Sequence, residues 1–130
     1  MAQNYKDLLV WKKAMNLVTE IYEISRSFPK EEVYGLTSQI RRSAVSVPSN
    51  IAEGKGRRSG AEFQQFLVQA RGSLYELETQ VQIAGNLGYI HIQRVEDLKN
   101  KSTEIAKMLN ALLETIKRQR SGQQLISKSQ

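Results

Sequence analysis

The side chains best suited to chemistry in this chain are cations, and they fall in two stretches. Residues 33–58 carry five basic side chains against one acidic, and residues 90–130 carry eight against four. Guanidinium and ammonium groups bind phosphates electrostatically, without reading base sequence. These stretches therefore predict contacts with the backbone of RNA or another nucleic acid. The candidate contact residues are Arg41, Arg42, Lys55, Arg57, Arg58, Lys117 and Arg118.

A plainer interpretation accounts for the same cations. They can serve solubility alone, and Lys117 and Arg118 fall near the expected end of the last helix, where the helix dipole favours positive charge by about 0.3–1 kcal/mol. The glycine-rich stretch 54–60 lacks the spacing of a phosphate-binding P-loop, and no strand precedes it. No aromatic residue lies within 41–58, so base stacking is not expected from this stretch.

A second group of polar residues lies close to the apolar stripes of two neighbouring helices. Buried polar groups need hydrogen-bond partners, so such a set can fix the register between two helices. A metal site is a poor alternative, because di-iron helix bundles use Glu-x-x-His pairs and that motif is absent from the chain. We predict a structural polar network formed by Asn50, Glu53, Ser73 and Glu76.

The sequence contains few of the residues that catalyse reactions in enzymes. The chain has no cysteine, and its one histidine, His91, falls in a predicted loop with no nucleophile at a suitable spacing. We therefore expect no catalytic residues, no metal ligands and no cofactor. The absence of cysteine also excludes disulfides and thiolate metal sites, which fits a reducing compartment.

The elements that must position these residues are helices. Apolar residues recur at alternating spacings of three and four in four segments, Val10 to Phe28, Val33 to Ile51, Phe63 to Ala84 and Val95 to Ile116. Sustained alternation at period two is absent, so no strands are expected. Short connections make successive helices antiparallel neighbours. The predicted fold is an all-α, up-down-up-down four-helix bundle over residues 1–118, followed by a flexible polar tail over 119–130.

Local signals set several helix ends. Ser59 and Glu62 form a capping-box sequence that opens the third helix, and Leu87-Gly88 closes it. Pro48 lies inside the second segment, so that helix is expected either to kink near Ala44 or to restart at Pro48. Gly72 lies inside the third helix, where a second helix could approach closely, either in the same subunit or in a second copy.

The sequence resembles the family of small four-helix bundle proteins encoded in intervening sequences of bacterial large-subunit ribosomal RNA genes, some of which are described as ribosomal proteins. The resemblance covers nearly the whole chain. It rests on four blocks in order: Asp7-Leu8 with Val10-Trp11-Lys12-Lys13-Ala14; Phe28-Pro29 with Glu32, Tyr34-Gly35-Leu36, Gln39 and Arg41-Arg42; Ser43-Ala44-Val45-Ser46-Val47-Pro48-Ser49-Asn50-Ile51-Ala52-Glu53-Gly54; and Ser73-Leu74-Tyr75-Glu76-Leu77-Glu78-Thr79 with Leu87-Gly88-Tyr89.

This resemblance implies a left-handed bundle that assembles into a homo-oligomeric ring, commonly a pentamer. It also connects the chain distantly to the accessory variability protein of diversity-generating retroelements, a basic pentameric barrel that contacts a reverse transcriptase and nucleic acid. It implies no catalytic activity.

Composition agrees with a binding protein. The net charge is +6 over 130 residues, which favours polyanionic partners. The first residues lack the apolar stretch of a signal peptide and no run is long enough to span a membrane, so we expect a cytoplasmic protein. We predict a non-enzymatic, self-assembling scaffold or binding module that binds RNA or a ribonucleoprotein. The alternative is a protein–protein adaptor ring whose charge serves only solubility.

Overall fold

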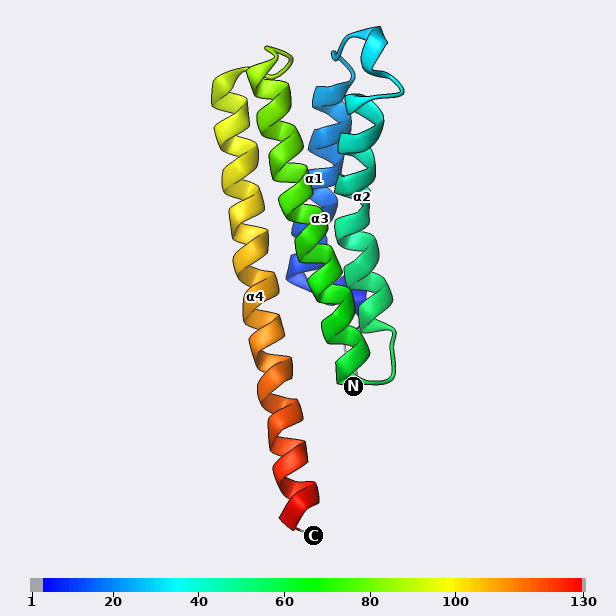
Figure 1. Ribbon diagram of the computed structural model, residues 1–130, viewed down its shortest axis with the longest axis vertical. Helices are drawn as coiled ribbons and strands as arrows, with labels where there is room; N and C mark the ends of the chain where they lie inside the picture. Colours follow the sequence, from blue (N-terminus) through cyan, green and yellow to red (C-terminus); the bar gives the residue numbers. More distant parts are fainter. Residues whose placement is uncertain (1–3, 130) are drawn as a thin grey trace.

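Four helices make up the molecule in the computed structural model, which describes the backbone of residues 4–129 and the side chains of residues 4–122 (Figure 1). They are α1 (Leu9–Ser25), α2 (Leu36–Lys55), α3 (Gly60–Asn86) and α4 (Ile92–Ser129). Two short 3₁₀ turns, η1 (Tyr5–Asp7) and η2 (Lys30–Glu32), precede α1 and α2. The described part of the chain contains no strand, so the all-α prediction is confirmed.

The helices lie side by side, and each packs against two neighbours. The α1–α2 and α3–α4 connections lie at one end of the molecule, and the α2–α3 loop lies at the other (Figure 1). The apolar stripes meet in one core, with Ile40, Leu74 and Leu109 fully buried. Burying a leucine or isoleucine side chain contributes about 1.5–3 kcal/mol, so these stripes hold the helices together.

Capping residues fix both ends of α3 as the sequence predicts. The Ser59 Oγ accepts a hydrogen bond from the backbone N–H of Glu62 at 3.2 Å. At the other end, Gly88 adopts a φ of 78°, a left-handed conformation that favours glycine. The Tyr89 N–H donates to the Ala84 carbonyl and the Gly88 N–H donates to the Gly85 carbonyl, at 2.9 and 3.0 Å, which is a Schellman motif.

The start of α2 differs from the prediction. The apolar spacing places Val33 among the core positions of this helix, but the helix begins at Leu36 and Val33 is 52% exposed. The preceding residues form η2, and the Glu32 carboxylate accepts the Leu36 N–H at 3.2 Å. The same carboxylate accepts the Tyr89 hydroxyl at 2.9 Å. Glu32 therefore caps α2 and ties the α1–α2 connection to the α3–α4 turn.

Pro48 lies within α2, which runs without a break, so the predicted restart at this residue is wrong. Its ring removes one backbone hydrogen bond from the helix. Polar side chains bond carbonyls in the preceding turn: Ser49 Oγ donates to the Val45 carbonyl and Asn50 Nδ2 donates to the Ser46 carbonyl, both at 2.8 Å. These contacts bring extra donors to the turn where the proline lacks one.

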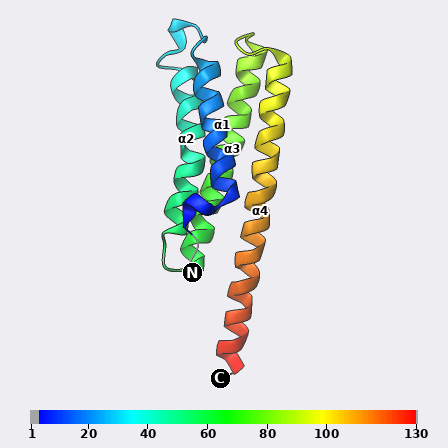
Figure 2. The ribbon, with the colours of Figure 1, turned by 180° about the vertical axis from the view of Figure 1, so that it is seen from behind.

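The fourth helix also differs from the prediction. Its backbone is helical through Ser129, whereas the sequence indicates a polar tail without periodic structure from Gln119. As a result α4 projects beyond the other three helices (Figure 2). The flexibility expected of residues 119–130 stays a prediction, and Gln130 lies outside the described residues. No helix in the described part of the chain is long and apolar enough to cross a membrane.

Candidate nucleic-acid interface

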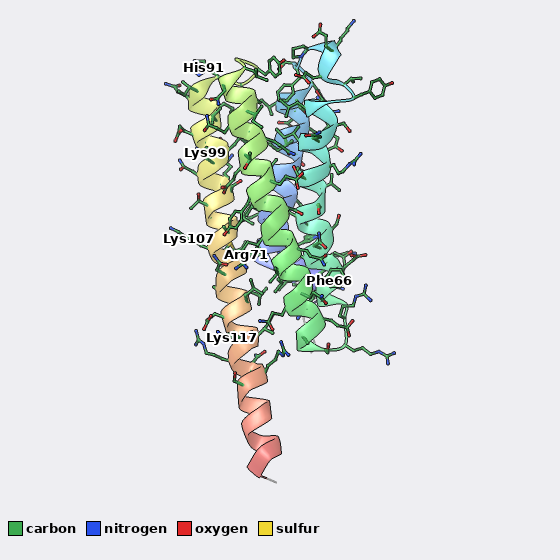
Figure 3. All side chains as sticks on the ribbon, viewed as in Figure 1. Phe66, Arg71, His91, Lys99, Lys107 and Lys117 are labelled. Atoms are coloured by element: carbon green, nitrogen blue, oxygen red, sulfur yellow. The ribbon has the colours of Figure 1, made fainter. Side chains whose placement is uncertain are left out.

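Most of the predicted contact residues lie toward the end of the molecule that holds the α2–α3 loop, in or beside that loop and on the facing stretch of α4 (Figure 1). Figure 3 shows Lys117 on α4, level with the start of α3 and on the opposite side of that helix from the loop. We call this surface the basic end. It consists of Lys55, Arg57, Arg58, Lys117, Arg118 and Arg120.

A close contact between α2 and α3 shapes the loop side of the basic end. Gly54 is buried, and a Cβ placed there would lie 2.7 Å from Phe66 Cβ and 3.0 Å from Phe63 Cδ1. Only glycine therefore lets the two rings pack against the end of α2. The rings in turn carry cations, with Lys55 Nζ 5.7 Å from the Phe63 centroid and Arg57 Cζ 4.8 Å from the Phe66 centroid. Such cation–π contacts hold the charges in place at the surface.

Arg120 joins α4 to the first two turns of α3. Its Nη1 donates to Gln64 Oε1 at 2.5 Å, and a Cβ at Gly60 would lie 3.4 Å from Arg120 Cγ. Lys117 and Arg118, on the same stretch of α4, are exposed. Because α4 continues to Ser129, these cations are not at a helix C-terminus, and the dipole explanation for them is wrong.

The other two predicted contact residues lie elsewhere. Arg41 is half-buried, with its Nε donating to Ser25 Oγ at 2.8 Å and its Nη2 donating to the Tyr22 carbonyl at 3.3 Å. Its guanidinium also stacks on the Tyr22 ring, with Cζ 4.6 Å from the centroid. Arg41 therefore caps the end of α1. Arg42 is exposed on α2, about 20 Å from Lys55 at the helical rise of 1.5 Å per residue.

The start of α3 adds little to phosphate binding. The N–H of Glu62 is taken by Ser59, and the Ser59 hydroxyl donates to the Glu62 carboxylate at 3.2 Å. A carboxylate in the first turn already balances the positive end of the helix dipole, and it repels a second anion. The basic end therefore attracts phosphates through side-chain cations.

The predicted polar network lies between α2 and α3, with a different membership. Ser46 Oγ and Ser73 Oγ are 2.8 Å apart, and Asn50 Nδ2 donates to Ser46 Oγ at 3.0 Å. Farther along, Ser43 donates to Gln80 Oε1, and Gln80 Nε2 donates to the Glu76 carboxylate at 3.2 Å. The structure places Glu53 on the exposed surface, outside this network.

Sequence reasoning missed the residues that join distant parts of the chain. Gln64 and Arg120 are 56 positions apart, and no local pattern pairs them. A signal for the ring contacts was present, since Phe63 and Phe66 follow a buried glycine and are spaced to share one helix face. His91 opens α4, where its Nδ1 accepts the Gln93 N–H at 3.3 Å. The described residues include no cluster of His, Asp and Glu that could hold a metal ion.

Comparison with known proteins places this fold in a family. A crystal structure of a protein with unknown function from the S23 ribosomal protein family, from Bacteroides thetaiotaomicron, matches with a TM-score of 0.75 and 26% identity, over 81% of this chain and 98% of that chain. No curated protein matches the sequence. The family model of the 23S rRNA-intervening sequence protein matches residues 6–111. That match spans most of the chain, and the protein therefore belongs to the 23S rRNA-intervening sequence protein family.

Proposed function

We propose that this protein is a non-enzymatic, self-assembling helical scaffold that binds the phosphate backbone of RNA with its basic end. The observation that carries the proposal is the contact of Arg120 with Gly60 and Gln64, which holds α4 and its cations against the first turn of α3, the helix that the cation-bearing α2–α3 loop leads into. The family's association with 23S rRNA makes RNA the first nucleic acid to test. The bundle is taken as left-handed with up-down-up-down topology, and as one subunit of a homo-oligomeric ring, with a pentamer as the working model.

The geometry favours backbone binding without base readout. Arg58, Lys117 and Arg118 are exposed, and Arg57 is held by a ring. Positive side chains that displace counterions give affinity that falls steeply with salt. The rings of Phe63 and Phe66 are half-buried and covered by cations, so they offer little stacking surface to bases. The expected binding is weak, tolerant of sequence and sensitive to salt.

The test compares two triple variants in which the same amount of charge is removed. One combines Arg57→Ala, Arg58→Ala and Lys117→Ala; the control combines Arg26→Ala, Lys30→Ala and Lys107→Ala, whose side chains are exposed outside the basic end. Binding of a fluorescent single-stranded RNA is measured by anisotropy across a salt series. Removing one cation that binds a phosphate lowers the slope of log K against log salt by about 0.7. We expect a slope lower by about 2 for the first variant and little change for the control.

Two results contradict the proposal. Equal weakening by both variants means that the whole surface acts through net charge, with no defined interface. Binding that is absent at low salt removes the nucleic-acid role, and capture of a protein partner from nuclease-treated lysate would then favour the adaptor alternative.

A further inference from the structure

Two surfaces with exposed apolar side chains lie on different sides of the molecule. One is an apolar groove of about 350 Å³ between α1 and α2, and the other is the outer face of α3. In Figure 1 α3 lies in front, and in Figure 2, seen from behind, α1 does. Exposed apolar patches on a soluble protein commonly mark interaction sites.

The groove has an apolar floor and mainly cationic surroundings. Trp11, Met15 and Val18 line it from α1, and Val45, Pro48 and Ala52 line it from α2. Met15 and Val45 are each 40% exposed. Lys12 and Arg42, each three positions before one of these two residues, lie one helical turn away on the same side of their helices. Over its whole length α2 carries three cations and one carboxylate, Glu53.

The outer face of α3 is apolar, with carboxylates exposed on its own helix and Arg120 of α4 beside Val68 at one end. Val68, Tyr75 and Ile83 are 44%, 47% and 42% exposed, and a Cβ placed on Gly72, on the same face, would meet no atom of another element within 4 Å. The charged side chains exposed on this helix are carboxylates, Glu62 and Glu76, and the helix as a whole carries three acidic residues and one basic. This acidic helix belongs to a chain with a net charge of +6.

Gly72 has no structural reason within the subunit. A glycine in an exposed helix interior costs about 1 kcal/mol relative to alanine. The sequence leaves open whether a helix of the same subunit covers it, and the structure shows that none does. A small residue between Val68 and Tyr75 gives a flat site for close approach from outside.

We propose that the outer face of α3 in one copy docks into the α1–α2 groove of a second copy. The inference rests on the self-assembly proposed above and names the surfaces that produce it. Two different surfaces of one subunit form a heterologous contact, which leaves one groove and one α3 face free in every pair and so adds further subunits in the same direction. Apolar burial holds the contact, and the carboxylates of α3 meet the cations beside the groove.

The test uses one variant for each surface. Val45→Glu places a carboxylate in the groove, and Val68→Glu places one on the α3 face; both side chains are exposed, so folding is preserved, which circular dichroism and thermal unfolding check. Tyr34→Glu, at a residue 97% exposed and outside both surfaces, is the matched control. Mass is measured in solution without nucleic acid. We expect each surface variant to be monomeric, with the dissociation constant of the contact raised at least about a hundredfold, and the control to assemble like the wild type.

Mixing the two variants gives the decisive result. The intact α3 face of Val45→Glu fits the intact groove of Val68→Glu, so the mixture forms a one-to-one dimer that cannot grow. A mixture that stays monomeric overturns the heterologous contact. Variants that assemble like the wild type overturn these surfaces while self-assembly itself stands. A wild type that is monomeric overturns both self-assembly and this inference, and its RNA binding is read separately by the salt series above.

Discussion

The α2–α3 contact is closely packed, whereas the α1–α4 contact is open and bridged by ion pairs. Small residues let α2 and α3 approach closely: Gly54 accommodates two phenylalanines, and the hydroxyls of Ser46 and Ser73 meet at 2.8 Å. Between α1 and α4 a groove of about 430 Å³ remains. Ion pairs bridge it: the Glu20 carboxylate accepts hydrogen bonds from the Lys101 ammonium at 2.6 Å and from the Arg94 guanidinium at 3.1 Å.

The first contact fixes how the two helices align, whereas the second adds only weak attraction between partly exposed charges. Polar side chains between α2 and α3 are buried or half-buried and hydrogen-bonded, so a shift in register costs hydrogen bonds as well as packing. Long charged side chains between α1 and α4 are partly hydrated, so their pairing is worth about 1 kcal/mol or less and weakens with salt. The α2–α3 pair is therefore the most closely packed part of the bundle, and it carries the loop of the basic end.

The largest effect that sharpens this comparison is expected at Gly54. Gly54→Ala brings a Cβ to 2.7 Å from Phe66 Cβ, and a well-packed helix contact cannot relax without moving the ring. We expect a loss of about 2–3 kcal/mol in the free energy of unfolding, measured by urea denaturation. Gly56→Ala is the matched control, because its Cβ would meet only backbone oxygens at 3.6 Å or more. Equal losses in both variants would show that the effect comes from the loop and not from the helix contact.

The next effect concerns the buried hydrogen bond between Ser43 and Gln80. Both side chains are buried, at 4% and 6% exposed. In a double-mutant cycle with Ser43→Ala and Gln80→Leu, we expect a coupling energy of about 1 kcal/mol, because either single change leaves a polar partner poorly satisfied. Thr79→Ala with Ser43→Ala serves as the control cycle, since Thr79 bonds only its own helix, at the Tyr75 carbonyl. A coupling energy near zero in the first cycle would show that this hydrogen bond does not help to fix the register of α2 against α3.

Local sequence signals account for the parts of the fold that sequence predicts well. The ends of α3 follow from Ser59, Glu62 and Gly88, because capping depends on residues a few positions apart. The error at Val33 has a physical cause, since the apolar spacing runs on through a 3₁₀ turn that exposes the side chain. Pro48 allows a restart of the helix on local grounds, but burial in the α2–α3–α1 core keeps the helix continuous.

The candidate site was less accessible from sequence because its geometry is set by distant contacts. Arg41 and Arg42 are adjacent in sequence, yet one caps α1 through Ser25 and Tyr22 and the other is exposed. Arg120 is held against the first turns of α3 by a hydrogen bond to Gln64, 56 positions away in the sequence. The sequence is sufficient to locate the cations, but contacts between distant residues decide which of them are exposed and which serve to hold helices together.

A smaller effect is expected in the open α1–α4 contact. Glu20→Gln weakens the hydrogen bonds to Lys101 and Arg94, and we expect a loss of about 0.5–1 kcal/mol that shrinks as salt is raised. Urea denaturation at low and high sodium chloride measures it. Lys101 carries a raised pKa, chiefly because its ammonium donates to Glu20. The contribution of this ion pair to the stability of the fold is therefore present below the ordinary lysine pKa and is lost as pH rises through the raised pKa. A salt-independent loss would assign Glu20 a packing role.

The smallest effect is expected at Glu78, on the side of α3 that faces α4. Burial raises the pKa of this carboxyl, and the nearby Lys99 ammonium lowers it by less. The protonated carboxyl thus stabilises the fold below the ordinary glutamate pKa, and that stabilisation is lost as pH rises through the raised value. At neutral pH Glu78→Gln removes a half-buried charge, and we expect a gain of about 0.5 kcal/mol after allowance for the partial exposure of the side chain.

The pH dependence distinguishes this cause from helix propensity. As pH falls, wild-type Glu78 takes up a proton and the advantage of Glu78→Gln disappears, which thermal unfolding at neutral and acidic pH measures. Glu96→Gln, at an exposed position on α4, is the control and should show no such gain at neutral pH. A gain at Glu78 that persists at acidic pH would mean that the amide packs better than either form of the carboxyl. The α3–α4 contact would then resemble the close-packed α2–α3 contact more than the ion-paired α1–α4 contact.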